Sequence, residues 1–260
     1  MLGWEGPVAV RPGLSAFSGG TVREIAELVD VADPGWPVVA DAIAEGVTSC
    51  VVLPPDHSAC RATLLQLQVT ARSLLGAVVL NSGGLALHHG WLRVYGGSGG
   101  SLPSLAEVNG FPASFDPSWV PEAGLVLAHD VLGGVFALNG ADCAGHGRPG
   151  EPGQVVYFAP DSLEWETFDG GYSHWLLWLL DGGPAGYYAD SFWPSWQAEV
   201  AELGLRDAIT MWPPLFSKEG AENVAGTTRS AVPLGQQLSF SVDFARQFGL
   251  PDPGPLGLLT

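Results

Sequence analysis

His129 and Asp130 are the residues whose types and spacing most directly suggest acid–base chemistry. They stand at the end of a predicted strand beside a glycine-rich turn, a place where catalytic groups are often held on a rigid scaffold. Together with His174, they could serve a small hydrolase-type enzyme. A turn-forming Asp beside a surface His is the commoner use of such a pair. His88 and His89 are adjacent on an extended segment, so they point to opposite faces and would not both bind one metal ion without a bend.

The three cysteines offer thiol chemistry at one place. Cys143 lies three residues before His146 in a glycine-containing segment, and a thiolate paired with that imidazole would be a nucleophile. A free loop cysteine is the simpler interpretation, because nothing in the sequence fixes the geometry of the two side chains. The odd cysteine count and the lack of Cys-x-x-Cys argue against a disulfide framework and favour a reducing cytoplasm.

The common catalytic and nucleotide-binding motifs are missing from the sequence. Lys218 is the only lysine and is followed by Glu219, which excludes a P-loop. The stretch 171–175 fails the last position of Gly-x-Ser-x-Gly, and His-Glu-x-x-His does not occur. The glycine-rich stretch Gly96–Ser101 follows a predicted strand without forming Gly-x-Gly-x-x-Gly, so we interpret it as a surface loop. We therefore predict no cofactor and no metal site.

Aromatic residues are the main candidates for binding. Seven of them could line a ligand groove, although aromatics at strand and helix spacing are more often core residues: Trp91, Tyr95, Trp165, Trp175, Trp178, Trp193 and Trp196. The residues that we select as binding candidates are Trp91, Arg93, Tyr95 and Tyr172. The competing hypothesis makes Trp91, Tyr172 and Trp175 core residues, with Arg93 on the exposed side of its strand or paired at its edge.

The charge of the chain restricts its partners. Ten basic residues against 27 acidic ones give a net charge of −17. Such a surface repels phosphate backbones and anionic lipid, so we predict neither nucleic-acid nor membrane binding. It would attract a basic protein, although net charge can also serve solubility alone. No apolar run approaches the roughly 20 residues of a membrane span, and the first residues do not form a secretory signal.

Apolar periodicity predicts helices at both ends of the chain and strands between them. The expected early helices are 22–29, with Thr21 and Glu24 as a capping box, 37–45, and 56–69, with Asp56 or Ser58 as the cap. The expected strands are 50–53, 85–87, 91–95, 125–130, 135–138, 154–159 and 163–168. The expected later helices are 174–180, capped by Ser173, and 196–203. The strand 91–95 alternates in a half-buried pattern, and Cys60 is expected in the core.

This order of elements predicts an α+β fold with a mainly antiparallel sheet flanked by helices. We expect a flexible leader at residues 1–20, a single α+β domain at 21–235, and a C-terminal extension at 236–260 that is loosely ordered at its end. The sequence does not indicate an oligomeric state.

Several stretches together resemble a bacterial family known as domain of unknown function 2625. They are Asp33–Pro37, Leu67–Ser73, His89–Val94, Leu132–Gly140, Val156–Glu166, Gly171–Ser173, Trp212–Leu215 and Arg229–Pro233. The resemblance covers roughly residues 21–235. It implies a shared fold and carries no established activity. The loops Gly96–Ser101 and Cys143–His146 depart from the family pattern.

The layout is also similar to that of the SUKH (Smi- and Knr-like) superfamily. The shared features are the strand start Gly90–Trp91, the hairpin at Gly133–Gly134 and the helix start at Tyr172–Ser173. Many bacterial SUKH-like proteins are immunity proteins that bind and neutralise a toxin. Two functions therefore stay open: a non-enzymatic module that binds a basic protein partner, and a small hydrolase-type enzyme using His129, Asp130 and His174.

Overall fold

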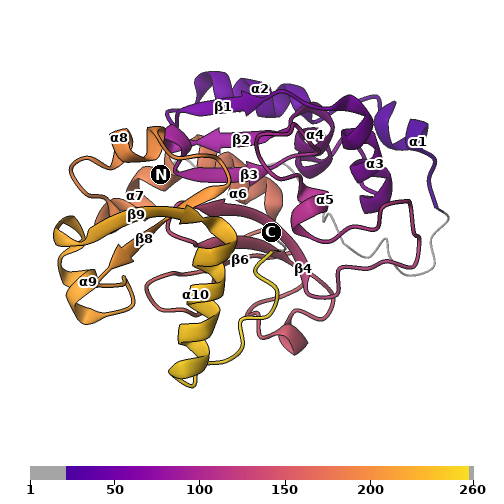
Figure 1. Cartoon of the computed structure of the whole chain (residues 1–260). Helices are drawn as coiled ribbons and strands as arrows, with labels where there is room; N and C mark the ends of the chain where they lie inside the picture. Colours follow the sequence, from indigo (N-terminus) through magenta and orange to yellow (C-terminus); the bar gives the residue numbers. More distant parts are fainter. Residues whose placement is uncertain (1–21, 258–260) are drawn as a thin grey trace, which may run out of the picture.

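The computed structural model describes residues 22–257 of the chain. The predicted leader at 1–20, the cap at Thr21 and residues 258–260 lie outside the described residues. The described chain forms a seven-stranded sheet, a separate two-stranded ribbon and surrounding helices (Figure 1). This confirms the predicted α+β class with an antiparallel sheet.

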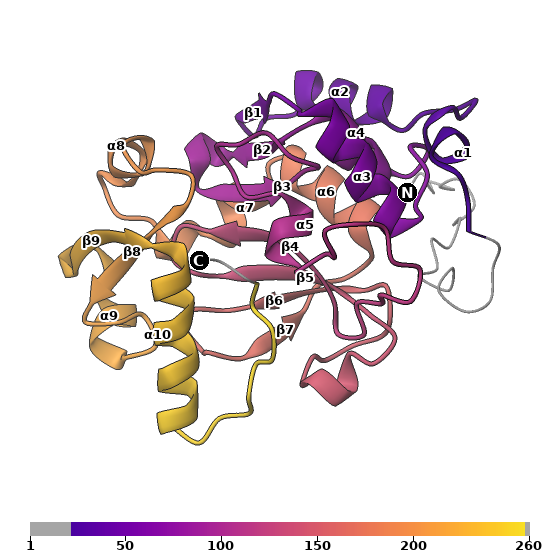
Figure 2. The ribbon, with the colours of Figure 1, turned by 45° about the vertical axis from the view of Figure 1, so that its right-hand side comes forward.

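The strands of the main sheet follow one another in chain order, each antiparallel to the next (Figure 2). They are β1 (Cys50–Leu53), β2 (Gly84–Leu87), β3 (Leu92–Tyr95), β4 (Gly124–Asp130), β5 (Val135–Asn139), β6 (Val155–Phe158) and β7 (Trp165–Thr167). The predicted hairpins β4–β5 and β6–β7 are confirmed. At the β4–β5 turn, Gly133 has a φ of +89°, which a residue with a side chain rarely adopts.

The early helices end within two residues of their predicted positions, but α1 begins at Ile25 rather than at residue 22, with Glu24 as its N-cap. They are α1 (Ile25–Val29), α2 (Trp36–Glu45), α3 (His57–Leu67) and α4 (Leu74–Asn81), the last of which was not predicted. Asp56 caps α3 by accepting hydrogen bonds from the amides of Ser58 and Ala59. The capping box of α1 is formed by Glu24 with Glu27.

The later part of the chain adds short helices, the ribbon and one long helix. The helices are α5 (Leu105–Val108), α6 (Tyr172–Leu180), α7 (Gly183–Tyr187), α8 (Trp196–Ala201), α9 (Lys218–Glu222) and α10 (Leu234–Gln247). The ribbon consists of β8 (Asp207–Trp212) and β9 (Thr228–Pro233). Single turns of 3₁₀ helix within residues 22–257 are η2 (His88–Gly90), η3 (Ala144–His146), η4 (Ala189–Ser191) and η5 (Val224–Gly226).

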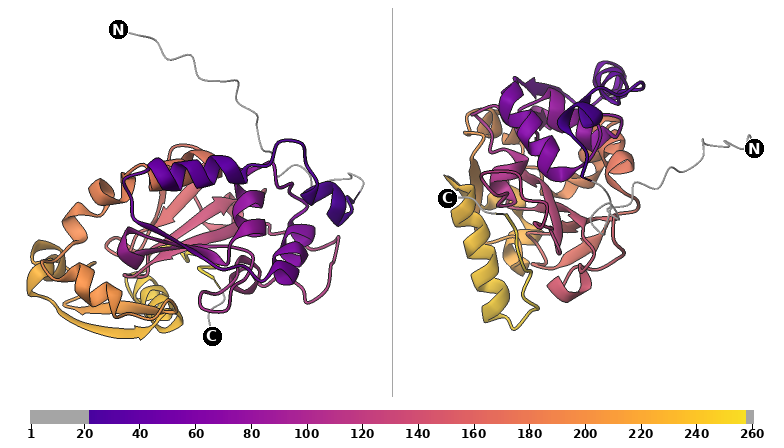
Figure 3. Two further views of the ribbon diagram at one scale, coloured as in Figure 1. Left: turned by 90° about the horizontal axis from the view of Figure 1, so that it is seen from above. Right: turned by 90° about the vertical axis from the view of Figure 1, so that its right-hand side faces the viewer.

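The sheet is covered on both faces. Helix α6 packs against α2 and α4 on one face, and α10 lies with the ribbon on the other, which is visible in the right-hand view of Figure 3. The α1–α4 group and the β8–β9 ribbon lie at opposite ends of the molecule (Figure 3, left). Most buried apolar side chains of the described residues belong to one core cluster that includes residues of the helices, the sheet and the ribbon.

Coverage of both faces corrects the half-buried interpretation of strand 91–95. All four residues of β3 are buried, because the ribbon covers the face that was expected to be wet. Arg93 is therefore 1% exposed, where the sequence had placed it on an exposed side. Its guanidinium donates to the backbone oxygens of Gly90 and of Asp207, the first residue of β8. Trp91, Tyr172 and Trp175 are core residues, as one of the two hypotheses proposed.

Candidate functional site

His129 and Asp130 point to opposite faces of the sheet, because successive side chains of a strand alternate. His129 is paired across the sheet with Arg93 and lies on the α10 face. Asp130 contacts Tyr157 and Tyr188 and lies on the α6 face. Both side chains have no exposed surface. The two residues are therefore neighbours in the chain without forming an acid–base pair in space.

The carboxylate of Asp130 fixes the β4–β5 turn and two tyrosines. Its Oδ1 accepts hydrogen bonds from the amides of Leu132 (2.8 Å) and Gly134 (2.9 Å). Its Oδ2 accepts from the hydroxyls of Tyr157 (2.7 Å) and Tyr188 (3.2 Å). Burial raises the pKa of Asp130, while these four donors oppose that rise. Its role as the turn-forming Asp agrees with the structural interpretation of the sequence.

His129 is a neutral core histidine. Its Nε2 donates to the backbone oxygen of Leu256 at 2.8 Å, because a carbonyl can only accept. Its Nδ1 then accepts the hydroxyl proton of Tyr95. Burial lowers the pKa of His129 to about 4, and the positive charge of Arg93 acts in the same direction. Both ring nitrogens are occupied, so the imidazole is not free to act as a base in this conformation.

The other candidates for chemistry do not join this pair. His174 is exposed on α6 beside Phe168. Cys143 is 3% exposed, and its Sγ points to the backbone oxygen of Gly150 at 3.7 Å. Among residues 22–257, no group of three His, Cys, Asp or Glu side chains is arranged to hold a metal ion. In the same part of the chain, no helix is long and apolar enough to cross a membrane.

The four predicted binding residues are all buried: Trp91 at 0%, Arg93 and Tyr95 at 1%, and Tyr172 at 5% exposure. None of them presents a side chain to a partner in this structure. Around Trp91, the rings of Phe192 and Trp196 pack edge-on, at centroid distances of 4.9 and 5.4 Å. The aromatic residues that the sequence offered as a groove are thus largely a packed cluster.

A cavity of about 330 Å³ opens on the α6 face, and we call it the tyrosine cavity. Its lining includes three tyrosines from β6 and the α7 region, Tyr157, Tyr187 and Tyr188. The carboxylates of Asp161, Glu166 and Asp190 also line it, and all three residues are exposed. No basic side chain is among the described residues that line the cavity. Tyr187 is 41% exposed and packs edge-on against both other tyrosines, at 5.4 and 5.1 Å.

The charges around the tyrosine cavity repel one another. Partial burial raises the pKa of Glu166, and the nearby negative charge of Asp161 raises it further. The pKa of Tyr187 is raised by burial first and then by Glu166, Asp130 and Asp161. Uncompensated negative charge beside aromatic rings suits a bound cation.

Comparison with known proteins places the chain in a family. Residues 25–237 match the family described as "Protein of unknown function DUF2625". The chain belongs to this family. It is 35% identical over 197 residues to the uncharacterized protein YbfG of Escherichia coli (strain K12), which covers 75% of this chain and 86% of YbfG. It is 30% identical over 195 residues to an uncharacterized protein of Haemophilus influenzae, covering 75% of this chain and 83% of that protein. No solved structure matches the chain significantly.

The residues of the tyrosine cavity lie inside the part of the chain that matches DUF2625. Asp161 lies between the predicted strands 154–159 and 163–168 and Glu166 lies in the second of them, and neither residue was predicted to bind a partner. The available signal was the Tyr187–Tyr188 pair followed by Asp190, which places aromatic rings and a carboxylate close together in the sequence. Tyr188 is joined to Tyr157 of β6 through Asp130, which accepts a hydrogen bond from each tyrosine and is distant from both in the sequence.

Proposed function

We propose that this DUF2625 protein binds a basic protein partner without turnover, and that the tyrosine cavity receives a cationic side chain of that partner. The observation that carries the proposal is the lining itself, in which the exposed ring of Tyr187 stands with three carboxylates above the buried Tyr157 and Tyr188. A guanidinium or ammonium group gains from the faces of aromatic rings and from nearby carboxylates. The volume of about 330 Å³ is at the small end of ligand cavities, and it suits one side chain rather than a large ligand.

The buried carboxylate of Asp130 supports this use of the tyrosines. The hydroxyls of Tyr157 and Tyr188 donate inward to Asp130, so these hydroxyls are engaged in the core and do not project into solvent. Tyr157 and Tyr188 are only 5% and 3% exposed, so their rings are an ordered support for the ring of Tyr187, which then loses little conformational entropy on binding. Tyr187 is the exposed member and offers the first contact.

The overall charge supports the same kind of partner. A net charge of −17 accelerates encounter with a cationic protein, and this steering weakens as salt shortens the screening length to about 8 Å at physiological strength. The similarity in layout to SUKH proteins, many of which neutralise toxins, fits a cytoplasmic immunity-like role. The hydrolase alternative has less support, because the hydrogen-bonding groups of His129 and Asp130 are engaged in the core and His174 is exposed elsewhere.

The test uses peptides in which Gly and Ser surround one, two or three Arg residues, titrated against the labelled protein and followed by NMR. The matched ligand control replaces each Arg by citrulline, which keeps the shape and removes the charge. We expect the Arg peptides to shift the signals of Tyr187 and Glu166 and the citrulline peptides to leave them unchanged.

The protein variants separate the cavity from general charge. Asp161→Asn, Glu166→Gln and Asp190→Asn together remove three carboxylates of the cavity. The control combines Asp41→Asn, Glu45→Gln and Asp181→Asn, three exposed acids outside the cavity lining, so both variants change the net charge from −17 to −14. We expect the cavity variant to weaken Arg binding at least about tenfold, since charge-assisted hydrogen bonds contribute roughly 1.5–3 kcal/mol. Equal weakening by both variants would refute a cavity-specific site.

A further inference from the structure

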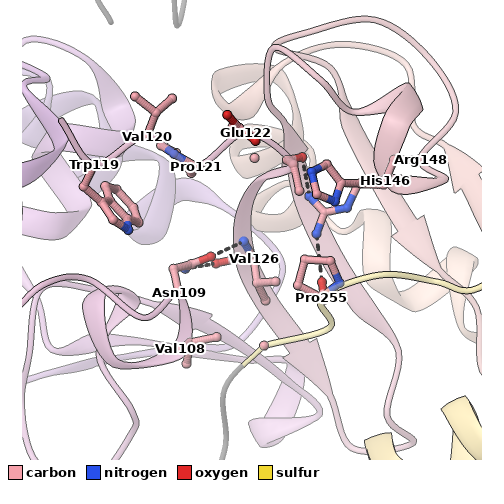
Figure 4. Close-up of a pocket in the computed structure, with 13 residues that line it drawn as sticks. Val108, Asn109, Trp119, Val120, Pro121, Glu122, Val126, His146, Arg148 and Pro255 are labelled. Atoms are coloured by element: carbon pink, nitrogen blue, oxygen red, sulfur yellow. Dashed lines mark hydrogen bonds between the residues drawn. The ribbon is translucent and has the colours of Figure 1, made fainter.

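Residues 250–257 cross the α10 face of the sheet without helix or strand, where the sequence had predicted a loose tail at 251–260. The segment turns at Gly254, whose φ is +67° and whose amide donates to the side chain of Asp252 at 2.9 Å. Three side chains of the sheet and its loops donate to the backbone oxygens of this segment. The indole of Trp165 donates to Pro253 at 2.8 Å, the guanidinium of Arg148 to Pro255 at 2.9 Å, and the imidazole of His129 to Leu256 at 2.8 Å. Figure 4 shows the Arg148–Pro255 contact at the edge of a cavity.

The side chains beneath the segment form one row across five strands. The pairing register aligns, in order from β3 to β7, Arg93, His129, Val135, Phe158 and Trp165. The segment contacts the row at His129 and at Trp165, three strands apart. Strands are about 4.8 Å apart, so the segment crosses the sheet rather than adding to its edge.

The donors recognise a chain that offers carbonyl oxygens and few amides. Prolines occupy positions 251, 253 and 255 of the segment, and a proline has no backbone N–H. All three contacts use donors of the protein and acceptors of the segment, so a proline-containing peptide can satisfy them with its carbonyl oxygens alone. The guanidinium of Arg148 also lies over the ring of Trp165 at 4.8 Å, so the two donors hold one another in place.

Two residues anchor the segment. Pro253 and Leu256 are buried, while Pro251, Asp252 and Pro255 are exposed. Gly254 brings the backbone close to the loop after β5, since a Cβ there would stand 3.0 Å from the backbone oxygen of His146. A peptide that binds in the same way needs two apolar residues three positions apart, with a glycine and an exposed residue between them.

The surface formed by His129, Arg148 and Trp165, which we call the groove, is only partly filled by residues 250–257. A cavity of about 360 Å³ is lined by Pro255 and Gly257 together with Arg148, His146 and Trp119 (Figure 4). A second cavity of about 350 Å³ is lined by Pro251 and Pro253 together with Arg148 and Trp165. The Nε of Arg148 is buried, and among the described residues it has no hydrogen-bond partner. Arg148 lines both cavities and donates to the segment that passes between them.

We propose that the groove marked by His129, Arg148 and Trp165 is a docking site for a proline-containing peptide of a partner protein that turns as residues 250–257 do, and that these residues occupy it in cis as a competitor. The partner peptide carries prolines at alternate positions and an apolar residue at the place of Leu256. The segment lies beyond the part of the chain that matches DUF2625, whereas all three donors lie inside it. This site is on the opposite face of the sheet from the tyrosine cavity and does not depend on it.

Occupation of the groove by residues 250–257 weakens the binding of any free peptide. A tethered segment acts at an effective concentration in the millimolar range, so a free peptide of equal intrinsic affinity binds weakly until the segment is released. The buried leucine is the place to release it. Leu256→Asp puts a charge into an apolar site and removes the anchor, and it changes no residue of the groove.

The probe is a fluorescently labelled octapeptide with the sequence of residues 250–257, Leu-Pro-Asp-Pro-Gly-Pro-Leu-Gly, followed by anisotropy with the full chain. We expect the Leu256→Asp protein to bind it at least about tenfold more tightly than the wild type does, since release removes the tethered competitor. Adding Trp165→Phe to that protein removes one donor and should weaken binding about 3- to 10-fold. Near-ultraviolet circular dichroism checks that each variant is folded, and Leu256→Ala replaces Leu256→Asp in the same assay if the charged variant does not fold.

Three controls test whether binding depends on the leucine and the prolines of the probe and not on the tyrosine cavity. A probe with Asp in place of its second leucine and a probe with Ala in place of its prolines should both lose binding. The cavity variant of Asp161, Glu166 and Asp190 should bind the octapeptide as the wild type does. Equal binding of the octapeptide to wild type and released variant would overturn the proposal, as would its failure to bind a folded released variant.

Discussion

Lowering the pH from 7.5 to 5 should destabilise the folded chain through His129. The folded protein keeps this imidazole neutral, because burial lowers its pKa to about 4 against an ordinary value of 6.5. Between pH 6.5 and pH 4, the unfolded chain binds a proton at His129 that the folded chain does not. Stability from His129 is therefore fully present above about pH 6.5 and is lost as the pH falls toward 4.

The size of the effect follows from the two pKa values. Each unit of difference corresponds to about 1.36 kcal/mol, so complete titration would cost about 3 kcal/mol. At pH 5 the unfolded imidazole is almost fully protonated and the folded one is mostly neutral, which gives a loss of about 2 kcal/mol relative to pH 7.5. The charged or titratable groups that act on His129 are Arg93 and Tyr95, and both keep their charge state over this range.

The measurement is urea unfolding followed by tryptophan fluorescence at intervals between pH 7.5 and 5, for the wild type and for His129→Gln. Glutamine keeps an amide donor for Leu256 and an oxygen for Tyr95 without titrating. The pKa of His88 is also lowered, by burial and by His89, and its contribution is common to both proteins. We expect the wild type to lose about 2 kcal/mol more than the variant over this range. Equal losses would show that His129 titrates normally in the folded chain, and the description of a sealed core histidine would then be wrong.

Two further predictions concern the Asp130 turn, and each has an internal control. Tyr157→Phe removes a hydrogen bond to a buried carboxylate and should lower the free energy of unfolding by about 1.5–3 kcal/mol. Tyr172→Phe should leave it almost unchanged, because the buried Tyr172 hydroxyl has no partner among the described residues. Urea unfolding compares the two variants. Gly134→Ala would put a Cβ 2.1 Å from Asp130 Oδ2 and should lower the free energy of unfolding by about 1–3 kcal/mol. A Cβ at Gly186 in α7 would meet nothing within 4 Å, so Gly186→Ala should be neutral or stabilising. Thermal unfolding that ranks Gly186→Ala as the more destabilising variant would contradict this geometry.

The local parts of the fold could be predicted because short-range chemistry determines them. Asp56 caps α3 through its own side chain, and α2 has Pro37 in its first turn and ends before Gly46, as the sequence indicated. The β4–β5 hairpin follows from Gly133 and from the two alternating strands around it. Such signals lie within a few residues of the structure that they specify.

The ribbon, α10 and the candidate site could not be predicted, because their reasons lie far away in the chain. Strand β9 is mostly exposed and has no strong apolar alternation, and it is positioned by pairing with β8. Arg93 looked like an exposed residue until the ribbon supplied the backbone oxygen of Asp207 as its acceptor, 114 residues later. His129 looked like a surface residue because its partner, the backbone oxygen of Leu256, is 127 residues away.

The alternation of one strand therefore decides how the chemistry of the chain is divided. On the α6 face, Asp130 orders two tyrosines from β6 and from the end of α7, and the cavity they line carries only negative charge among its described residues. On the α10 face, His129 acts with Arg148 and Trp165 as a set of donors, and these donors are filled by the chain's own carbonyl oxygens. The proposed cation site and the proposed peptide site therefore lie on opposite faces of the sheet. A one-residue shift of β4 would exchange His129 and Asp130 between the faces and destroy both sets at once, so the register of this strand is a requirement that the two proposed sites share.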